Sequence, residues 1–117
     1  MSVDPLDLAD VMDRVQDDVD LLLELLDIFV EDYEKKRPRL EKSINDKDFG
    51  QTHSLAHSLK GAASNIGAKP LFETFVKLDE MAKNNDLNQA ATVLAAMTQR
   101  FNHLKRRIAT LKTEFKR

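Results

Sequence analysis

The central segment of the chain reads Leu55-Ala56-His57-Ser58-Leu59-Lys60-Gly61-Ala62-Ala63-Ser64-Asn65-Ile66-Gly67-Ala68. At about 100° of rotation per residue, a helix through this segment brings four polar or small residues to one side, each within about 40° of His57. They are His53, His57, Gly61 and Ser64. The apolar residues gather on the opposite side of the helix: Phe49, Leu55, Ala56, Leu59, Ala62, Ala63 and Ile66. We therefore expect His57 to face solvent, with small residues beside it and Lys60 one turn further on.

Apolar periodicity predicts helices along the whole chain, and no stretch alternates with the period of two that is typical of strands. The expected helices cover about residues 5–13, 18–45, 48–66, 69–84 and 87–115. Asp46 or Asp48 is expected to cap the helix that carries His57, and Gly67 is expected to end that helix. Pro38 lacks a backbone donor, so we expect a kink or a break near Glu34–Arg37 in the second helix.

Four amphipathic helices joined by short turns predict an all-α fold, an antiparallel up-down-up-down four-helix bundle. The short helix near the N-terminus is expected to cover one end of this bundle. A length of 117 residues fits a single domain, 1–117, and 42% of hydrophobic residues suffice for its core. Because the apolar faces of such a bundle satisfy one another, we expect a monomer.

Composition argues against several classes of function. The net charge of -2 and the pI near 5.9 argue against a dedicated nucleic-acid binder, because such domains are usually basic. The absence of cysteine excludes disulfides, thiolate zinc sites and a cysteine nucleophile, and it fits a cytoplasmic location. The apolar runs are far too short to span a membrane, and the first ten residues lack the basic segment of a signal peptide.

The exposed histidine suggests nucleophilic chemistry. A neutral imidazole, with an ordinary pKa of about 6.5, is a good nucleophile at neutral pH because one ring lone pair is free. Such a ring can take a phosphoryl group from an acyl phosphate and pass it on, while Lys60 neutralises charge on the phosphoryl oxygens. Gly61 costs about 1 kcal/mol relative to alanine inside a helix, and an open approach for a partner would account for it. The alternative is an ordinary surface histidine, with Gly61 admitted for close helix packing.

Other uses of the histidines and charged clusters find less support. The spacing of His53 and His57 is compatible with zinc, but the neighbouring positions of this face offer no third ligand. His103 is expected to be structural or incidental. The basic clusters at 34–37 and 105–107 are expected to be solvated, although either could touch an acidic partner. The chain has no glycine-rich phosphate loop, so it is not expected to be a kinase or another enzyme in its own right.

The pentad His57-Ser58-Leu59-Lys60-Gly61 resembles the H-x-L-K-G signature of histidine-containing phosphotransfer (HPt) domains. Residues similar to that family, in its order and spacing over 6–110, are Leu25-Leu26-Asp27-Ile28-Phe29, Asp48-Phe49, Leu55-Ala56, Ala62-Ala63-Ser64-Asn65-Ile66-Gly67-Ala68, Leu78-Asp79 and Asn85-Asp86-Leu87. The resemblance implies a phosphocarrier that relays phosphoryl groups between receiver-domain aspartates in a multistep two-component system. It also implies that His57 is phosphorylated at Nε2, that Lys60 steadies the phosphoryl group and that Gly61 keeps the approach open. A helical adaptor that binds a signalling partner without being phosphorylated is the alternative function.

The resemblance further implies the partners, which are response-regulator receiver domains and a sensor or hybrid histidine kinase. No cofactor or metal is expected in this chain, because the catalytic Mg²⁺ and its acidic pocket belong to the receiver. The residues expected to dock the partner are His53, Ser54, Gly61 and Ser64. A modest exposed apolar patch is expected beside them, with the candidates Leu22, Leu26 and Ile28.

Two positions depart from the family's pattern. Thr52 replaces a common leucine, which is expected to loosen the local packing, and Asp79 replaces a more usual glutamate. Neither is expected to touch the phosphorylation site. The cognate kinase and receiver stay open, as does the choice between a free-standing protein, which Met1 favours, and a part of a hybrid kinase.

Overall fold

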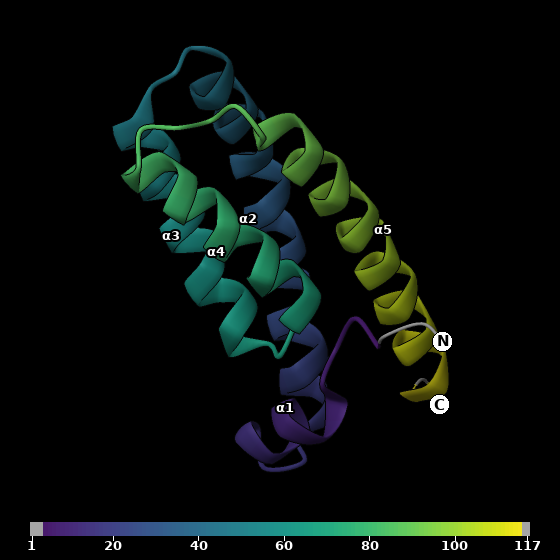
Figure 1. Ribbon diagram of the computed structural model, residues 1–117. Coiled ribbons are helices and arrows are strands. Elements are labelled where there is room, and N and C mark those ends of the chain that lie inside the picture. The colour runs from purple at the N-terminus through teal and green to yellow at the C-terminus, as the bar shows by residue number, and fades with distance from the viewer. Residues whose placement is uncertain (1–3, 116–117) are drawn as a thin grey trace.

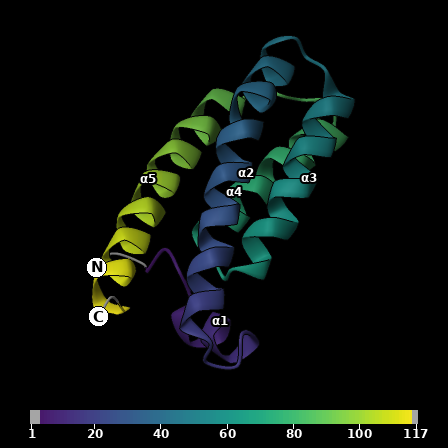
Figure 2. The ribbon, with the colours of Figure 1, turned by 180° about the vertical axis from the view of Figure 1, so that it is seen from behind.

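A computed structural model describes residues 4–115, which form five α-helices and no strand. The helices are α1 (Leu8–Arg14), α2 (Val19–Asn45), α3 (Phe49–Asn65), α4 (Lys69–Lys83) and α5 (Ala90–Phe115). Consecutive long helices run in opposite directions, and α1 lies at the end of the bundle where α2 begins (Figure 1). Helices α2 and α4 each pack against both α3 and α5, and the view from behind shows α2 between α3 and α5 (Figure 2). The expected all-α bundle is confirmed, and within residues 4–115 none of these helices combines the length and apolar composition needed to cross a membrane.

Aspartate side chains cap the N-termini of α1, α2 and α3, where the residues are Asp7, Asp18 and Asp48. Oδ1 of Asp7 accepts a hydrogen bond from the backbone N–H of Asp10 at 3.1 Å, so α1 begins at Leu8, later than expected. Oδ1 of Asp48 accepts from the backbone N–H of Gln51 at 3.0 Å and caps α3 in the same way. Each cap satisfies a backbone donor that the first turn of a helix leaves without a partner.

The later helix boundaries follow glycine, proline and turn residues. Gly67 follows α3 with a φ of +68°, in the left-handed region that favours glycine, so the expected end of this helix is confirmed. Pro70 lies in the first turn of α4, where its missing N–H has no cost. The last helix begins at Ala90 and not near residue 87, because Oδ1 of Asp86 accepts from the N–H of Asn88 at 3.1 Å and holds the chain in a turn.

Pro38 lies inside α2 without ending it, so of the kink or break expected near Glu34–Arg37 the break is wrong. Proline removes one backbone hydrogen bond and crowds the preceding turn, which often interrupts a helix. Here Tyr33 and Leu40, on either side of the proline, are both buried in the core. Their packing holds the two halves of α2 in one helix.

The core follows the predicted apolar stripes of the four long helices. The buried apolar residues of these stripes include Leu22, Leu26, Phe29, Tyr33, Leu40, Leu55, Leu59, Leu71, Phe75, Leu78, Met97, Phe101, Leu104, Ile108 and Leu111. Apolar residues that pack against this core while only partly buried include Ile44, Phe72, Met81, Leu87, Leu94 and Phe115. Because Leu22 and Leu26 are fully buried, they cannot belong to the expected docking patch, whereas Ile28 is 54% exposed.

Thr52 does not loosen the packing, contrary to expectation. Its side chain is fully buried, and its hydroxyl hydrogen-bonds with Oγ of Ser43 at 2.8 Å. The Ser43 hydroxyl in turn donates to the carbonyl oxygen of Leu40 at 2.8 Å. Buried hydroxyl groups are costly only when they lack partners, so this pair joins α2 to α3 without a penalty.

Candidate functional site

His57 lies in the middle of α3, and its side chain is 64% exposed, as expected. The opposite face of the helix is buried and carries Leu55, Ala56, Leu59 and Ala63. A Cβ atom placed on Gly61, one turn after His57, would meet no atom within 4 Å. Ser54 and Ser64 are also exposed. The imidazole ring can therefore be approached from solvent over an open helix face.

The carboxylate of Asp79, on α4, lies among the residues around His57. Its Oδ1 hydrogen-bonds with Nδ1 of His53, and its Oδ2 accepts from Nζ of Lys60 at 3.1 Å. Oδ2 also lies 4.0 Å from Nδ1 of His57 and 3.6 Å from Nζ of Lys83. The expectation that Asp79 stays clear of the expected site at His57 is therefore wrong.

Asp79 is almost completely buried, with 2% of its side chain exposed. Burial alone would raise the pKa of its carboxyl group, but hydrogen bonds from Lys60 and His53, together with their positive charges, outweigh that effect. The pKa of Asp79 consequently lies below its ordinary value, and the group is a carboxylate at neutral pH. One buried negative charge thus holds side chains that extend from two helices.

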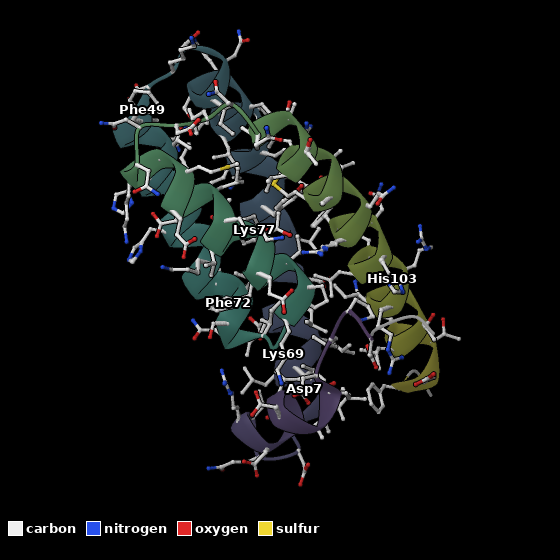
Figure 3. All side chains as sticks on the ribbon, in the orientation of Figure 1. Asp7, Phe49, Lys69, Phe72, Lys77 and His103 are labelled. Atoms are coloured by element: carbon white, nitrogen blue, oxygen red, sulfur yellow. The ribbon has the colours of Figure 1, made fainter. Side chains whose placement is uncertain are left out.

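The two histidines of α3 are neighbours, with their ring centroids 5.7 Å apart. Within residues 4–115, no group of three or more His, Cys, Asp or Glu side chains is arranged to hold a metal ion. The nearest carboxylate, Asp79, already accepts from Lys60. His103 lies on α5, on the other side of the bundle from α3 (Figure 3). The zinc alternative gains no support from this arrangement.

A further cation reaches this region from α2. Nζ of Lys36 donates to Oγ of Ser58 at 2.7 Å and to Oδ2 of Asp32 at 3.0 Å. Ser58 follows His57 directly in the chain, so this turn of α2 lies level with the histidine. Positive groups therefore stand near His57 on α2, on α3 and on α4.

Apolar side chains are exposed along the same side of α2. Leu21 is 40% exposed and Ile28 is 54% exposed, and Leu25 lies partly exposed between them. At 100° per residue these three lie within about 80° of the direction of Lys36, so they extend the surface beside α3 toward the α1 end. We call Leu21, Leu25 and Ile28 the α2 apolar stripe. Of the three residues expected in the apolar patch, this stripe contains Ile28, whereas Leu22 and Leu26 are buried.

Sequence reasoning missed three charged residues of this region, Asp79, Lys83 and Lys36. Each reaches the site from a helix other than α3, and the face of one helix does not reveal what its neighbours contribute. One signal was present for Asp79, because it occupies the core face of α4 together with Phe75 and Ala82. A charged residue at such a position is costly to bury unless it is paired.

Comparisons with known proteins show what this chain is similar to. A family model described as Hpt domain matches residues 24–114. The structure is similar to the crystal structure of histidine-containing phosphotransfer protein B (HptB) from Pseudomonas aeruginosa PAO1, with a TM-score of 0.88 and 26% sequence identity. That similarity covers 98% of this chain and 100% of that chain. No curated protein matches the sequence. Helices α3 and α4, which carry the site, lie entirely within the residues that the family model matches.

Proposed function

The chain belongs to the Hpt domain family, and from that membership and the geometry around His57 we propose that this histidine carries the phosphoryl group. Histidine phosphotransfer in a phosphorelay is the function of the chain, which is a phosphocarrier domain. The observation that supports the choice of His57 is its 64% exposed ring on an open helix face, with Lys60 one turn away. His53 is less suited, because its side chain is less exposed, 42% against 64% for His57.

The proposed step moves a phosphoryl group between an aspartyl phosphate of a receiver domain and Nε2 of His57. The Nε2 lone pair forms the new N–P bond while the acyl P–O bond breaks, and the receiver carboxylate leaves with the electron pair. The reverse step passes the group to a receiver aspartate. A neutral imidazole attacks through a lone pair that is already free, so this chain needs no general base. Catalysis then depends on positioning and on neutralising the charge of the phosphoryl oxygens.

Lys60 is the residue to which we assign that neutralisation on this chain. Its Nζ is held by Asp79 at 3.1 Å, one turn of α3 from His57. Lys83 lies 3.6 Å from the same carboxylate and adds a second positive charge to this face. We assign no cofactor or metal to the chain itself, and we place the Mg²⁺ of the reaction in the receiver partner.

Hpt proteins interact with receiver domains and histidine kinases in phosphorelays. We assign receiver docking to His53, Ser54, Gly61 and Ser64 together with the α2 apolar stripe. Transient signalling partners use small interfaces, and a short apolar stripe beside an open polar helix face fits such an interface. The proposal includes a monomer in the cytoplasm that receives phosphoryl groups and has no autokinase activity.

The assignment is tested by incubating the chain with a phosphorylated receiver domain and locating the phosphate by mass spectrometry. Label on His57 that survives alkali and is lost in acid is expected. His57→Gln should abolish this label, and His103→Gln, the same change on α5, should leave it intact. Binding of the receiver without any label would instead favour an adaptor that is not phosphorylated.

A further inference from the structure

The buried carboxylate of Asp79 has more neighbours than it can bond at once. Its Oδ1 is occupied by His53, and its Oδ2 accepts from Lys60 at 3.1 Å. Nδ1 of His57 lies 4.0 Å from Oδ2, which is beyond hydrogen-bonding distance. Lys83 lies 3.6 Å from the same oxygen. In this unphosphorylated state, Lys60 thus holds the oxygen that is nearest to His57.

A phosphoryl group on His57 changes that competition. If the ring carries its proton on Nδ1 and attacks through Nε2, the product keeps the Nδ1–H and gains a positive charge. The phosphoryl oxygens attract Lys60, which is one helical turn away. When Lys60 moves toward them, Oδ2 of Asp79 loses the hydrogen bond from Lys60 just as the ring becomes a charged donor. Charge-assisted hydrogen bonds of this kind are the strong ones.

We propose, on the basis of the phosphorylation of His57 proposed above, that Asp79 is a positioning residue that exchanges Lys60 for His57 during transfer. Before transfer Oδ2 accepts from Lys60, and after transfer it accepts from Nδ1–H of His57 while Lys60 contacts the phosphoryl oxygens. The retained proton prepares the ring for onward transfer. When the N–P bond breaks, its electron pair returns to Nε2 and the imidazole leaves as a neutral group.

His53 competes with His57 for hydrogen bonds to the carboxylate of Asp79. The two rings are 5.7 Å apart, and both turn Nδ1 toward Asp79. The charged groups that face this region are His53 and Lys60 from α3, Asp79 and Lys83 from α4, and Lys36 with Asp32 from α2. Within residues 4–115, α5 adds no ion pair to Asp79. Loss of Asp79 and loss of His53 should therefore act on His57 in opposite directions.

The test follows the loss of the phosphoryl group to water from the purified phosphorylated chain at a series of pH values. A phosphorylated imidazole hydrolyses faster when its ring is protonated. The midpoint of the plot of hydrolysis rate against pH therefore reports the pH at which Nδ1 loses its proton. A carboxylate within about 4–6 Å displaces such a midpoint by one pH unit or more. In Asp79→Asn the midpoint should fall by about one pH unit. At pH values above the midpoint, where the rate depends on pH, phosphoryl loss should then be about tenfold slower than in the wild type.

Three further variants complete the design. Asp79→Glu keeps the carboxylate and should retain a midpoint close to that of the wild type. Asp46→Asn removes an exposed carboxylate that pairs with Lys42 and should leave the profile unchanged. His53→Ala frees Oδ1 of Asp79 for His57 and should move the midpoint to higher pH.

An Asp79→Asn profile that coincides with the wild type, in a chain with unchanged circular dichroism, would overturn the proposal. A fall or no change of the midpoint in His53→Ala would do the same, and this variant decides alone if Asp79→Asn does not fold. Failure of the proposed function has a different signature, because the wild-type chain would then carry no phosphoryl group on His57 at all. In that case both proposals fail together.

Discussion

Gly61 lowers the stability of the helix but leaves the approach to His57 open, and substitutions there should separate these two effects. Glycine inside a helix costs about 1 kcal/mol relative to alanine, and arginine is nearly as good a helix former as alanine. A Cβ atom at this position meets nothing within 4 Å, so no clash offsets the gain. Gly61→Ala and Gly61→Arg should therefore each raise the free energy of unfolding by about 1 kcal/mol, or the melting temperature by about 4 °C for a chain of this size.

Phosphoryl transfer should respond in the other direction and in proportion to side-chain size. Residue 61 lies one turn after His57 on the same face, so its side chain projects beside the ring. The methyl group of Gly61→Ala leaves most of the approach open and should slow transfer by no more than about threefold. Reacting atoms must come within about 3–3.5 Å, and a misplacement of 1 Å can cost about a hundredfold in rate. The long side chain of Gly61→Arg should slow transfer by at least that factor.

Urea unfolding followed by circular dichroism measures the first effect, and single-turnover transfer from a phosphorylated receiver measures the second. Gly50→Ala is the matched control, because its Cβ would meet only Oδ1 of Asp48 at an ordinary 3.8 Å, two turns before His57. This control should leave the transfer rate unchanged. A loss of stability in Gly61→Ala would show that the glycine serves close helix packing. Transfer at the wild-type rate in Gly61→Arg would refute the role in access.

Three further predictions concern stability. His57→Gln should change the free energy of unfolding by less than about 0.5 kcal/mol, because the side chain is 64% exposed, and a larger loss in urea titrations would mean that the ring is needed for packing. Gly67→Ala should lower that free energy by about 1–2 kcal/mol, because φ is +68° and the new Cβ would lie 3.2 Å from the carbonyl oxygen of Asp7; an unchanged urea midpoint would contradict this. The pKa of Asp79 is lower in the folded chain than its ordinary value of 3.8, so the ionised carboxylate stabilises the fold at pH values above 3.8. This stabilisation is lost as the pH falls through the lower pKa of the folded state. Urea titrations of the wild type below about pH 4 should show this loss, and Asp79→Asn should lack that part of the pH dependence; equal slopes in the two chains would argue against it.

The helices were predictable because their signals are local. Apolar spacing identifies the stripe that each helix buries, and caps such as Asp48 and Gly67 mark where α3 begins and ends. The exceptions have causes beyond the local sequence. Pro38 remains inside α2 because buried residues on both sides of it hold the helix together, and those contacts come from other helices.

The sequence predicts that α2 carries an exposed apolar surface, but it does not predict which residues form that surface. Leucine and isoleucine occupy several adjacent positions there, and the choice of face depends on how α2 packs against α3 and α5. The structure buries Leu22 and Leu26 and exposes Leu21 and Ile28. Near the boundary of an apolar stripe, side chains of similar hydropathy compete for the same core positions. Only the packing of the neighbouring helices decides between them.

Part of the site could likewise be predicted from the local sequence, and part depends on contacts between residues far apart in the chain. The exposure of His57 follows from one helix face, whereas Asp79 is 26 residues from His53 and 19 from Lys60 along the chain. A buried carboxylate must nevertheless be paired, because an unpaired charge in the interior is costly. Since Asp79 is held by groups that flank His57, the pairing that makes this charge tolerable in the fold also places it beside the imidazole. We infer that the same ion pairs that hold α4 against α3 set the electrostatics of the phosphotransfer site.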